Sequence, residues 1–239
     1  ASLCGILWTP EIRSANSARE WLNRMQTVCF SPMANLNAWA SGVKPWDFPE
    51  VTDAVRDVIE LRMRLLPYFY SSFAAYNRDG IPPVRAMILE GGFNGGEQTV
   101  IEGELDSETN PYATGEIIEK NDQFMFGSSI MVAPFYDEYA IERSVQLPAG
   151  NWYDFYTGEL VGNNAQITVT AEQLKDRTPL FVKEGAVIPM LSKAVVNSRD
   201  AQGHQLIVRH YGKVTGGFEL YEDDATTFDY QRGESRIRT

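Results

Sequence analysis

The segment Gly5–Arg13, with sequence GILWTPEIR, carries the first side chains that could do chemistry. It runs from apolar residues into Trp8, Glu11 and Arg13. A carboxylate at the end of a strand can act as a catalytic acid, accept hydrogen bonds from a sugar, or remain a solvated charge paired with Arg13. These three roles stay open for Glu11 from the local sequence.

The other reactive residue types are few. His204 and His210 stand beside no Cys, Asp or Glu at ligand spacing, so a histidine metal site or a Ser-His-Asp triad has little material. Cys4 and Cys29 lie among apolar residues, which favours buried thiols over a disulfide and leaves the compartment open. The run Glu222–Asp224 lacks the glycine and the spaced ligands of a calcium loop, so we expect an exposed turn. Carboxylates remain the main chemical resource.

The overall composition excludes several classes of function. The chain has 239 residues, 44% of them hydrophobic, which is enough for a sizeable core. Its 21 basic and 32 acidic residues give a net charge of −11, which disfavours nucleic acids and anionic membrane surfaces as partners. No apolar run approaches the roughly 20 residues of a membrane span. A neutral partner is therefore favoured.

Two helical patterns occupy the first third of the chain. Ser17 and Glu20 form a capping-box pair ahead of apolar residues at three-to-four spacing, which predicts a helix of about a dozen residues. A second pattern begins near Asp53 and should stop at the Asp79-Gly80 turn signal. Pro67 lies inside it and predicts a kink or a break into two helices.

The strand patterns change character along the chain. Apolar runs over residues 3–8 and 83–89 flank the helices, and this order of strand, helix, helix, strand is typical of a parallel α/β unit. From Gln123 onward, short apolar runs alternate with Gly, Pro, Asn and Asp, which predicts an antiparallel β-sandwich with Trp152 buried. The acidic, glycine-rich stretch 91–122 is expected to be a solvated excursion rather than a lid.

The order of the motifs resembles the later part of a family 31 glycoside hydrolase, and the resemblance covers nearly the whole chain. The segments that carry it are GILWTPEI, FSPMANLNAW, RMRLLPYFYSSF, PPVRAMILEG, QFMFGSSIMVAPF, LPAGNWYDFYTGE, PLFVKEGAVIPM and FELYEDDATTFDY. The resemblance implies an α+β multi-domain fragment, in which the end of a (β/α)8 TIM barrel precedes antiparallel β-sandwich domains. Residues 3–8 then match the seventh barrel strand and residues 83–89 the eighth. The expected divisions are 1–122 for the barrel, 123–192 for the proximal sandwich and 193–239 for the start of a distal domain.

The same resemblance implies a sugar-binding role for residues at the barrel mouth, where such active sites lie. Trp8, Glu11 and Arg13 follow the seventh strand. The pair Glu11-Ile12 matches the Asp-Ile of the family's Asp-Ile-Gly-Gly, while Arg13-Ser14 replaces the two glycines. Less room is left for the close backbone approach that glycine permits, and a charge is added.

A second departure from the family pattern follows the first helix. Asn35 and Asn37 stand where the family usually has Arg and His, and Trp39 could offer an apolar face to a sugar ring. Both asparagines could instead cap or turn the backbone. Asp47 is expected in a turn, and Arg85 either faces the pocket or pairs with a core carboxylate.

The resemblance implies that the two catalytic aspartates, on the fourth and sixth strands, precede Ala1. No residue of this chain is then the nucleophile, and the chain alone should be inactive. We expect part of an exo-acting, retaining α-glycoside hydrolase that needs no cofactor and no metal. Its partners would be an oligosaccharide, with α-galactosyl as the leading sugar, and the N-terminal remainder of its own enzyme. The alternatives are a non-catalytic carbohydrate-binding or structural β-domain, and a transglycosylase of the same family.

Overall fold

The computed structural model describes residues 12–37, 43–91, 93, 99–101, 117–119 and 122–239. The expected strand 3–8 and the residues Cys4, Trp8, Glu11 and Trp39 lie outside these ranges. The elements, in chain order, are α1 (Ala18–Val28), η2 (Pro49–Val51), α2 (Thr52–Arg64), α3 (Leu66–Asp79), β1 (Val84–Ala86), η3 (Met87–Leu89), β2 (Thr99–Ile101), β3 (Ile117–Glu119), β4 (Phe124–Phe126), β5 (Ile130–Val132), β6 (Glu142–Gln146), β7 (Asn151–Asp154), β8 (Leu160–Asn163), β9 (Gln166–Thr170), α4 (Ala171–Leu174), β10 (Leu180–Lys183), β11 (Val187–Leu191), η4 (Ser198–Ala201), β12 (Leu206–His210), β13 (Leu220–Glu222), η5 (Asp229–Arg232) and β14 (Arg236–Arg238).

The helices begin and end where their sequence signals lie. The Ser17 hydroxyl accepts a hydrogen bond from the Glu20 backbone N–H at 3.1 Å and caps α1. Pro67 lies in the first turn of α3, where its missing N–H costs nothing, and the chain breaks between α2 and α3 at Leu65. Gly80 ends α3 with φ at +74°, a conformation that favours glycine. The predicted break and the predicted stop are both confirmed.

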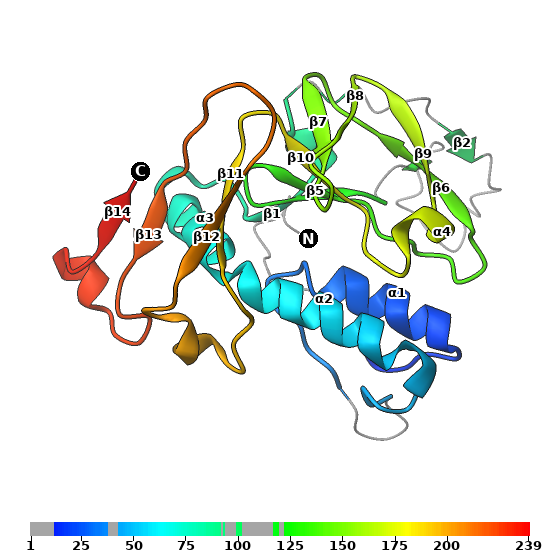
Figure 1. Cartoon of the computed structure of the whole chain (residues 1–239), viewed down its shortest axis with the longest axis horizontal. Helices are drawn as coiled ribbons and strands as arrows, with labels where there is room; N and C mark the ends of the chain where they lie inside the picture. The colour runs from blue at the N-terminus through cyan, green and yellow to red at the C-terminus, as the bar shows by residue number, and fades with distance from the viewer. Residues whose placement is uncertain (1–11, 38–42, 92, 94–98, 102–116, 120–121) are drawn as a thin grey trace, which may run out of the picture.

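A six-stranded antiparallel sheet forms the centre of the molecule, with strand order β1-β4-β5-β10-β7-β8 (Figure 1). The expectation that residues 83–89 form a parallel barrel strand is wrong. Val84 of β1 is registered against Phe126 of β4 in an antiparallel pair, and Met87–Leu89 turn into a 3-10 helix. A short apolar run carries no information on strand direction, because the partner of Val84 is Phe126, far along the chain.

Both faces of this sheet are buried at its central strands β5 and β10, where alternate residues pack into different layers. Ile130, Val132, Leu180 and Val182 pack into the core shared with the helices. Met131 and Phe181, between them in sequence, belong to a second core under the β6–β9 ribbon. Trp152 lies in this second core with 1% of its surface exposed. The prediction of an antiparallel sandwich with a buried tryptophan is therefore confirmed.

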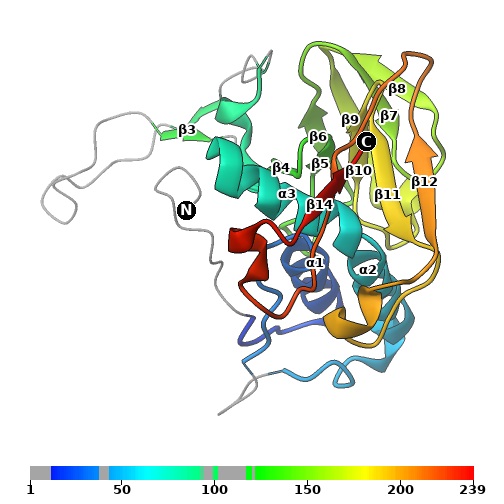
Figure 2. The same ribbon diagram turned by 90° about the vertical axis from the view of Figure 1, so that its left-hand side faces the viewer.

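The helices form the layer on the other face of the sheet. Figures 1 and 2 both show α1 and α2 side by side beneath the sheet, with α3 leading up toward β11 and β13. The Tyr68 hydroxyl of α3 donates to the Phe126 carbonyl at 3.0 Å and accepts from the Ser129 backbone N–H at 2.8 Å. Gly127 lies between these two contacts with φ at +65°, and an added Cβ would come within 2.4 Å of the Tyr68 ring. The β4–β5 turn is thus docked on α3.

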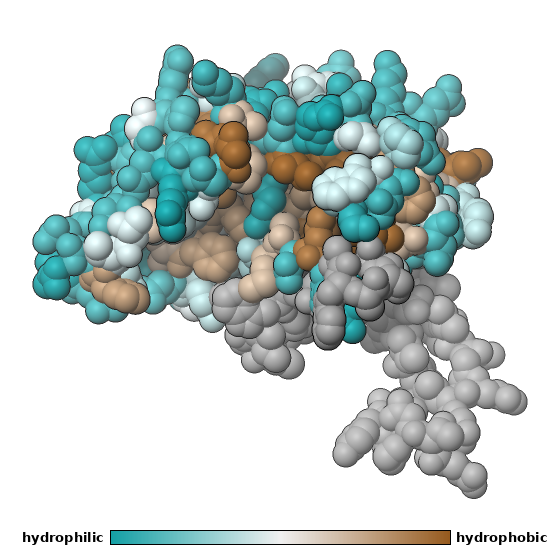
Figure 3. Space-filling model, turned by 90° about the horizontal axis from the view of Figure 1, so that it is seen from below, coloured by the Kyte–Doolittle hydropathy of each residue, from teal (hydrophilic) through white to brown (hydrophobic). Residues whose placement is uncertain are grey.

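The surface carries large apolar side chains in several places. Figure 3 shows apolar surface in patches on the face seen from below, beside the residues drawn in grey. The exposed set includes Ile81, Ile88 and Leu89, which follow α3 and β1 and are 57%, 76% and 48% exposed. Across the described ranges, no helix is long and apolar enough to cross a membrane.

Candidate functional site

The predicted site residues Arg13, Asn35 and Asn37 are brought together by one parallel β-bridge between Ile12 and Leu36. The Ile12 N–H donates to the Asn35 carbonyl at 3.0 Å, and the Asn37 N–H donates to the Ile12 carbonyl at 2.9 Å. The named strands of the described ranges all pair antiparallel, so parallel pairing occurs there only at this bridge. Parallel pairing of segments joined by a helix is the pattern of a (β/α) unit.

The bridge residue is buried, whereas its polar neighbours face outward. Ile12 is 6% exposed and belongs to the core formed with α1 and α2. Arg13 and Asn35 are exposed, and Asn37 is partly exposed. Alternation along an extended segment places successive side chains on opposite faces, which explains why one residue anchors the bridge and its neighbours do not. Three of the six predicted site residues therefore share one polar rim; Trp8, Glu11 and Trp39 lie outside the described ranges.

A second loop runs beside this rim. The Val43 N–H donates to the Arg13 carbonyl at 3.3 Å. A few residues later, the Asp47 carboxylate accepts the Lys44 N–H at 2.9 Å, while the Asp47 N–H donates to the Lys44 carbonyl at 3.1 Å. Asp47 is the turn residue that the sequence predicted.

Arg62 fixes the turn from which the second half of the bridge starts. Its guanidinium, on α2, donates to the carbonyl oxygens of Cys29 at 2.6 Å, Ser31 at 2.7 Å and Pro32 at 3.3 Å. These carbonyls follow the end of α1, where backbone acceptors lack helical partners and a cation is favourable. Burial lowers the pKa of Arg62. Sequence reasoning missed this residue, because RMRLL looks like an ordinary helix surface.

Cys29 lies at the end of α1 as a buried free thiol. Burial raises its pKa to about 12, so the thiol stays protonated at neutral pH. The expectation of a buried, unreactive cysteine is confirmed for Cys29.

A buried ionic group ties β1 to β10. The Arg85 guanidinium donates to the Glu90 carboxylate at 2.7 Å and to the Gly127 carbonyl at 2.6 Å. Lys183 contacts the other Glu90 oxygen. The Glu90 side chain is 8% exposed and holds two cations, which is a structural arrangement. Of the two alternatives for Arg85, the pairing with a core carboxylate holds.

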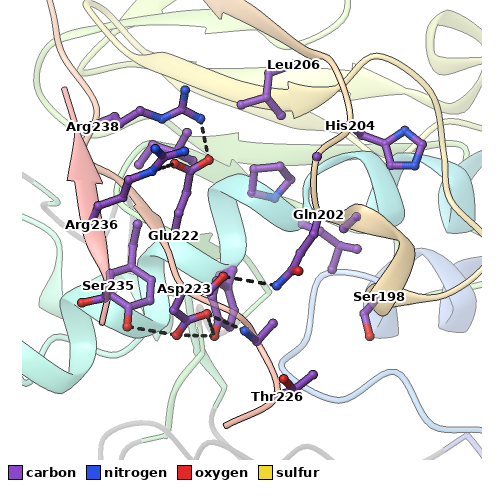
Figure 4. Close-up of a pocket in the computed structure, with 18 of the residues that line it drawn as sticks. Ser198, Gln202, His204, Leu206, Glu222, Asp223, Thr226, Ser235, Arg236 and Arg238 are labelled. Carbon is purple, nitrogen blue, oxygen red and sulfur yellow. Dashed lines mark hydrogen bonds and ion pairs between the residues drawn. The ribbon is translucent and has the colours of Figure 1, made fainter. Parts of the chain in front are cut away.

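A cleft of about 1090 Å³ lies between the first turns of α3, residues 198–206 and the β13–β14 pair. Figure 4 shows Glu222 pointing toward Arg236 and Arg238, with which it forms ion pairs. The neighbouring Asp223 accepts the Tyr70 hydroxyl at 2.8 Å and the Tyr221 hydroxyl at 3.0 Å. No local motif predicts this cleft, because one wall comes from the start of α3 and the others from residues 198–238.

The acidic run beside the cleft begins at the end of β13 and leads into a bend at residues 225–228. Asp224 accepts the backbone N–H groups of Thr227 at 3.0 Å and Thr226 at 3.1 Å, and these bonds, the one from Thr227 first, lower its pKa to about 2. Among the described residues, no group of three or more His, Cys, Asp and Glu side chains could hold a metal ion. The expectation of an exposed turn over Glu222–Asp224 holds only for Asp224, because Glu222 is the last residue of β13 and is, like Asp223, partly buried.

Comparison with known proteins gives two matches to family models. Residues 1–72 match "Glycosyl hydrolases family 31 TIM-barrel domain", and residues 80–188 match "Glycosyl hydrolase family 31 C-terminal domain". The parallel bridge lies within the first match, and β1, β4, β5, β10, β7 and β8 lie within the second.

Individual relatives agree with these matches. An alpha-xylosidase of Saccharolobus solfataricus is 32% identical over 216 residues, which cover 89% of this chain and 26% of the relative. Alpha-glucosidase 2 of Bacillus thermoamyloliquefaciens is 29% identical over 92% of this chain and 26% of its own length. An isomaltosyltransferase of Sporosarcina globispora is 31% identical over 71% of this chain and 13% of its own length.

The fold also matches a solved structure. The crystal structure of the GH31 alpha-xylosidase of Xanthomonas citri superposes with a TM-score of 0.73 at 27% identity, over 92% of this chain and 22% of that chain. The chain thus spans about a quarter of the length of the two curated glycosidases above.

Proposed function

Because this chain belongs to glycoside hydrolase family 31, we propose that it forms the end of the catalytic barrel and the adjoining sandwich of an exo-acting, retaining α-glycoside hydrolase. The observation that carries the proposal is the parallel Ile12–Leu36 bridge, which lies within the barrel-domain match and is followed by the antiparallel sheet within the C-terminal match. Parallel pairing at the end of a barrel places polar residues where substrate binds.

In this proposal the chain positions substrate and does not supply the covalent step. A retaining glycosidase uses two carboxyl groups about 5 to 5.5 Å apart, one as nucleophile and one as acid and base. We infer that both aspartates precede Ala1 in the full-length protein. Glu11, Arg13, Asn35 and Asn37 would then contact the hydroxyls of the first sugar.

Trp8 and Trp39 would pack against the apolar face of that sugar ring in the same subsite. The reaction needs no cofactor.

The leading substrates are terminal α-glucosyl and α-xylosyl groups, which the names of the relatives support. A second candidate, α-galactosyl, rests on Asn35 and Asn37, whose amides present donors and acceptors that differ from those of Arg and His. An unpaired buried polar group costs about 1 to 3 kcal/mol, so this difference could change the preference between epimers about tenfold or more.

The test measures kcat/KM of the full-length protein for the p-nitrophenyl α-glycosides of glucose, xylose and galactose. We expect turnover of at least one, and the highest value identifies the sugar. Asn35→Arg with Asn37→His should change the ratio between glucoside and galactoside. Absence of turnover on all three substrates would contradict the proposal and favour a non-catalytic carbohydrate-binding or structural role.

A transglycosylase of the same family is the remaining alternative, and the relative named isomaltosyltransferase favours it. Analysis of the products separates the two activities. A hydrolase releases free sugar at the rate of bond cleavage, whereas a transglycosylase yields longer oligosaccharides.

We further propose that the N-terminal remainder of the enzyme covers part of the apolar surface. Ile88 and Leu89, which are 76% and 48% exposed, directly follow β1. Exposed apolar side chains of this size in one short segment are typical of a surface that is buried against another part of a protein.

A further inference from the structure

We propose that the cleft between α3, residues 198–206 and β13–β14 binds a neutral oligosaccharide chain. The inference rests on the proposed function, because a glycosidase meets such chains as substrates. None of the lining residues comes from the segments 12–37 or 43–47 that form the polar rim. The cleft would therefore hold a sugar chain through residues of its own.

The charge of the cleft selects a neutral ligand. Three carboxylates line it, from Glu222, Asp223 and Glu234, and so do three guanidinium groups. Glu222 forms ion pairs with Arg236 and Arg238, so much of this charge is compensated within the wall itself. A phosphorylated or polyanionic ligand would need an excess of cations, as in known phosphate sites.

Two tyrosine rings supply an aromatic wall. Tyr70 of α3 is 41% exposed, and its ring centroid lies 5.8 Å from that of Tyr221, with 51° between the planes. Asp223 accepts hydrogen bonds from both phenol groups, which holds the rings in place before any ligand arrives. An aromatic surface fixed in advance loses little conformational entropy when the apolar face of a sugar packs on it.

The rest of the wall offers hydrogen-bonding groups without forming a catalytic set. Figure 4 shows Gln202, His204 and Ser235 around the cleft, together with the acidic residues. The Gln202 amide donates to the Asp223 carbonyl at 3.2 Å and keeps its own oxygen as an acceptor. The volume of about 1090 Å³ slightly exceeds the usual range of sites for small molecules and leaves room for several sugar units.

The test uses native gel electrophoresis of the full-length protein through gels that contain soluble starch or dextran. An exo-acting site engages chain ends, which are scarce in a polymer, so retardation reports binding along the chain. We expect Tyr70→Ala to weaken the affinity for the retarding polymer about tenfold, which corresponds to the loss of one aromatic packing contact. Tyr70→Phe keeps the ring and should retain most of the affinity.

Two controls separate the cleft from general damage. Tyr76→Ala removes an aromatic ring from the same helix outside the cleft and should leave retardation unchanged. Gln202→Ala changes an exposed cleft residue with little effect on folding and should weaken retardation, which keeps the proposal testable if Tyr70→Ala unfolds. For each variant, kcat/KM on a p-nitrophenyl glycoside should stay within about twofold of the parent value, because a single sugar does not reach the cleft.

The outcomes distinguish this inference from the proposed function. If the protein turns over an aryl glycoside but Tyr70→Ala and Gln202→Ala are retarded like the parent, the cleft proposal is wrong and the proposed function stands. If no aryl glycoside is turned over but retardation depends on Tyr70, the cleft proposal stands and the proposed function is wrong. Equal retardation of Tyr70→Ala and Tyr76→Ala would also contradict the proposed sugar binding in the cleft.

Discussion

The Ile12–Leu36 bridge and the β5–β10 pair are held together in different ways. The bridge is formed by two backbone hydrogen bonds of the buried residue Ile12, and its polar neighbours are exposed or partly exposed to solvent. The β5–β10 pair has three registered positions and buried side chains on both faces. The sheet therefore stabilises itself, whereas the polar rim depends on supports such as Arg62. The residues proposed to bind the substrate lie in the region with less stability of its own, as functional segments often do.

The largest expected effect is the loss of all activity when the chain is produced without the rest of the enzyme, while the sheet still folds. Residues 1–239 produced alone should give a circular dichroism spectrum rich in β structure and no turnover of any aryl α-glycoside, because the covalent step needs both carboxylates. The full-length protein assayed in parallel is the control. Turnover by a fragment free of contaminating glycosidase would show that the polar rim works without an upstream barrel.

Within the sheet, Trp152→Ala should be the most damaging single change. The indole is 1% exposed and its N–H donates to the Pro148 carbonyl at 3.0 Å. Truncation of a buried tryptophan costs about 3 to 5 kcal/mol of the free energy of unfolding. Urea denaturation of the full-length protein measures it. Trp46→Ala is the matched control, since Trp46 is 70% exposed and its loss should change stability by less than about 0.5 kcal/mol.

At the polar rim, Arg62→Gln should cost less stability and more activity. Its loss leaves carbonyls at the end of α1 without their donor, which should lower the free energy of unfolding by about 2 kcal/mol. The turn ahead of Asn35 then relaxes, and kcat/KM of the full-length enzyme should fall about tenfold or more, because small misplacements in an active site are costly.

Two further variants sharpen this prediction. Arg62→Lys keeps a cation at the same carbonyls and should recover part of the activity, chiefly in KM if substrate positioning is what was lost. Arg56→Gln removes an exposed arginine of the same helix and should be neutral. Equal losses of kcat/KM for Arg62→Gln and Arg56→Gln would contradict the proposed positioning role of Arg62.

The smallest expected effect concerns Asp224 and the turn that it forms with Thr226 and Thr227. The folded state lowers the pKa of Asp224 from 3.8 to about 2, so the carboxylate stabilises the fold above about pH 4. That contribution is lost as the pH falls toward 2 and Asp224 becomes protonated. Asp224→Asn should show a weaker decline of the thermal midpoint between pH 4 and pH 2 than the parent. Parallel declines would mean that the turn does not contribute to acid stability.

Local signals predicted the elements well. The Ser17 cap, the Pro67 break and the Gly80 stop each act within a few residues, and each is confirmed. The antiparallel sandwich followed from the spacing of strands and turns. The direction of residues 83–89 was wrong, because pairing with β4 depends on a chain segment far away in sequence. The domain limits at 122 and 192 stay predictions.

Part of the site could not be predicted from the sequence, because its contacts join residues that are far apart along the chain. The pairing of Arg13 with the neighbourhood of Asn35 and Asn37 followed from the family pattern, and the bridge brings their backbones together. Arg62 acts on carbonyls about 30 residues away, and backbone acceptors have no signature in sequence. Tyr70 and Tyr221 meet at Asp223 only through the fold.

Cys29 is a built-in probe of local opening in the helical layer. Its thiol is covered at the end of α1 and its carbonyl is held by Arg62, so a thiol reagent reaches the sulfur only when this part of the molecule opens. In a Cys4→Ser background, the rate of modification of Cys29 becomes a direct readout of that opening. The modification rate of this buried thiol thus reports how often the segment that leads to Asn35 opens.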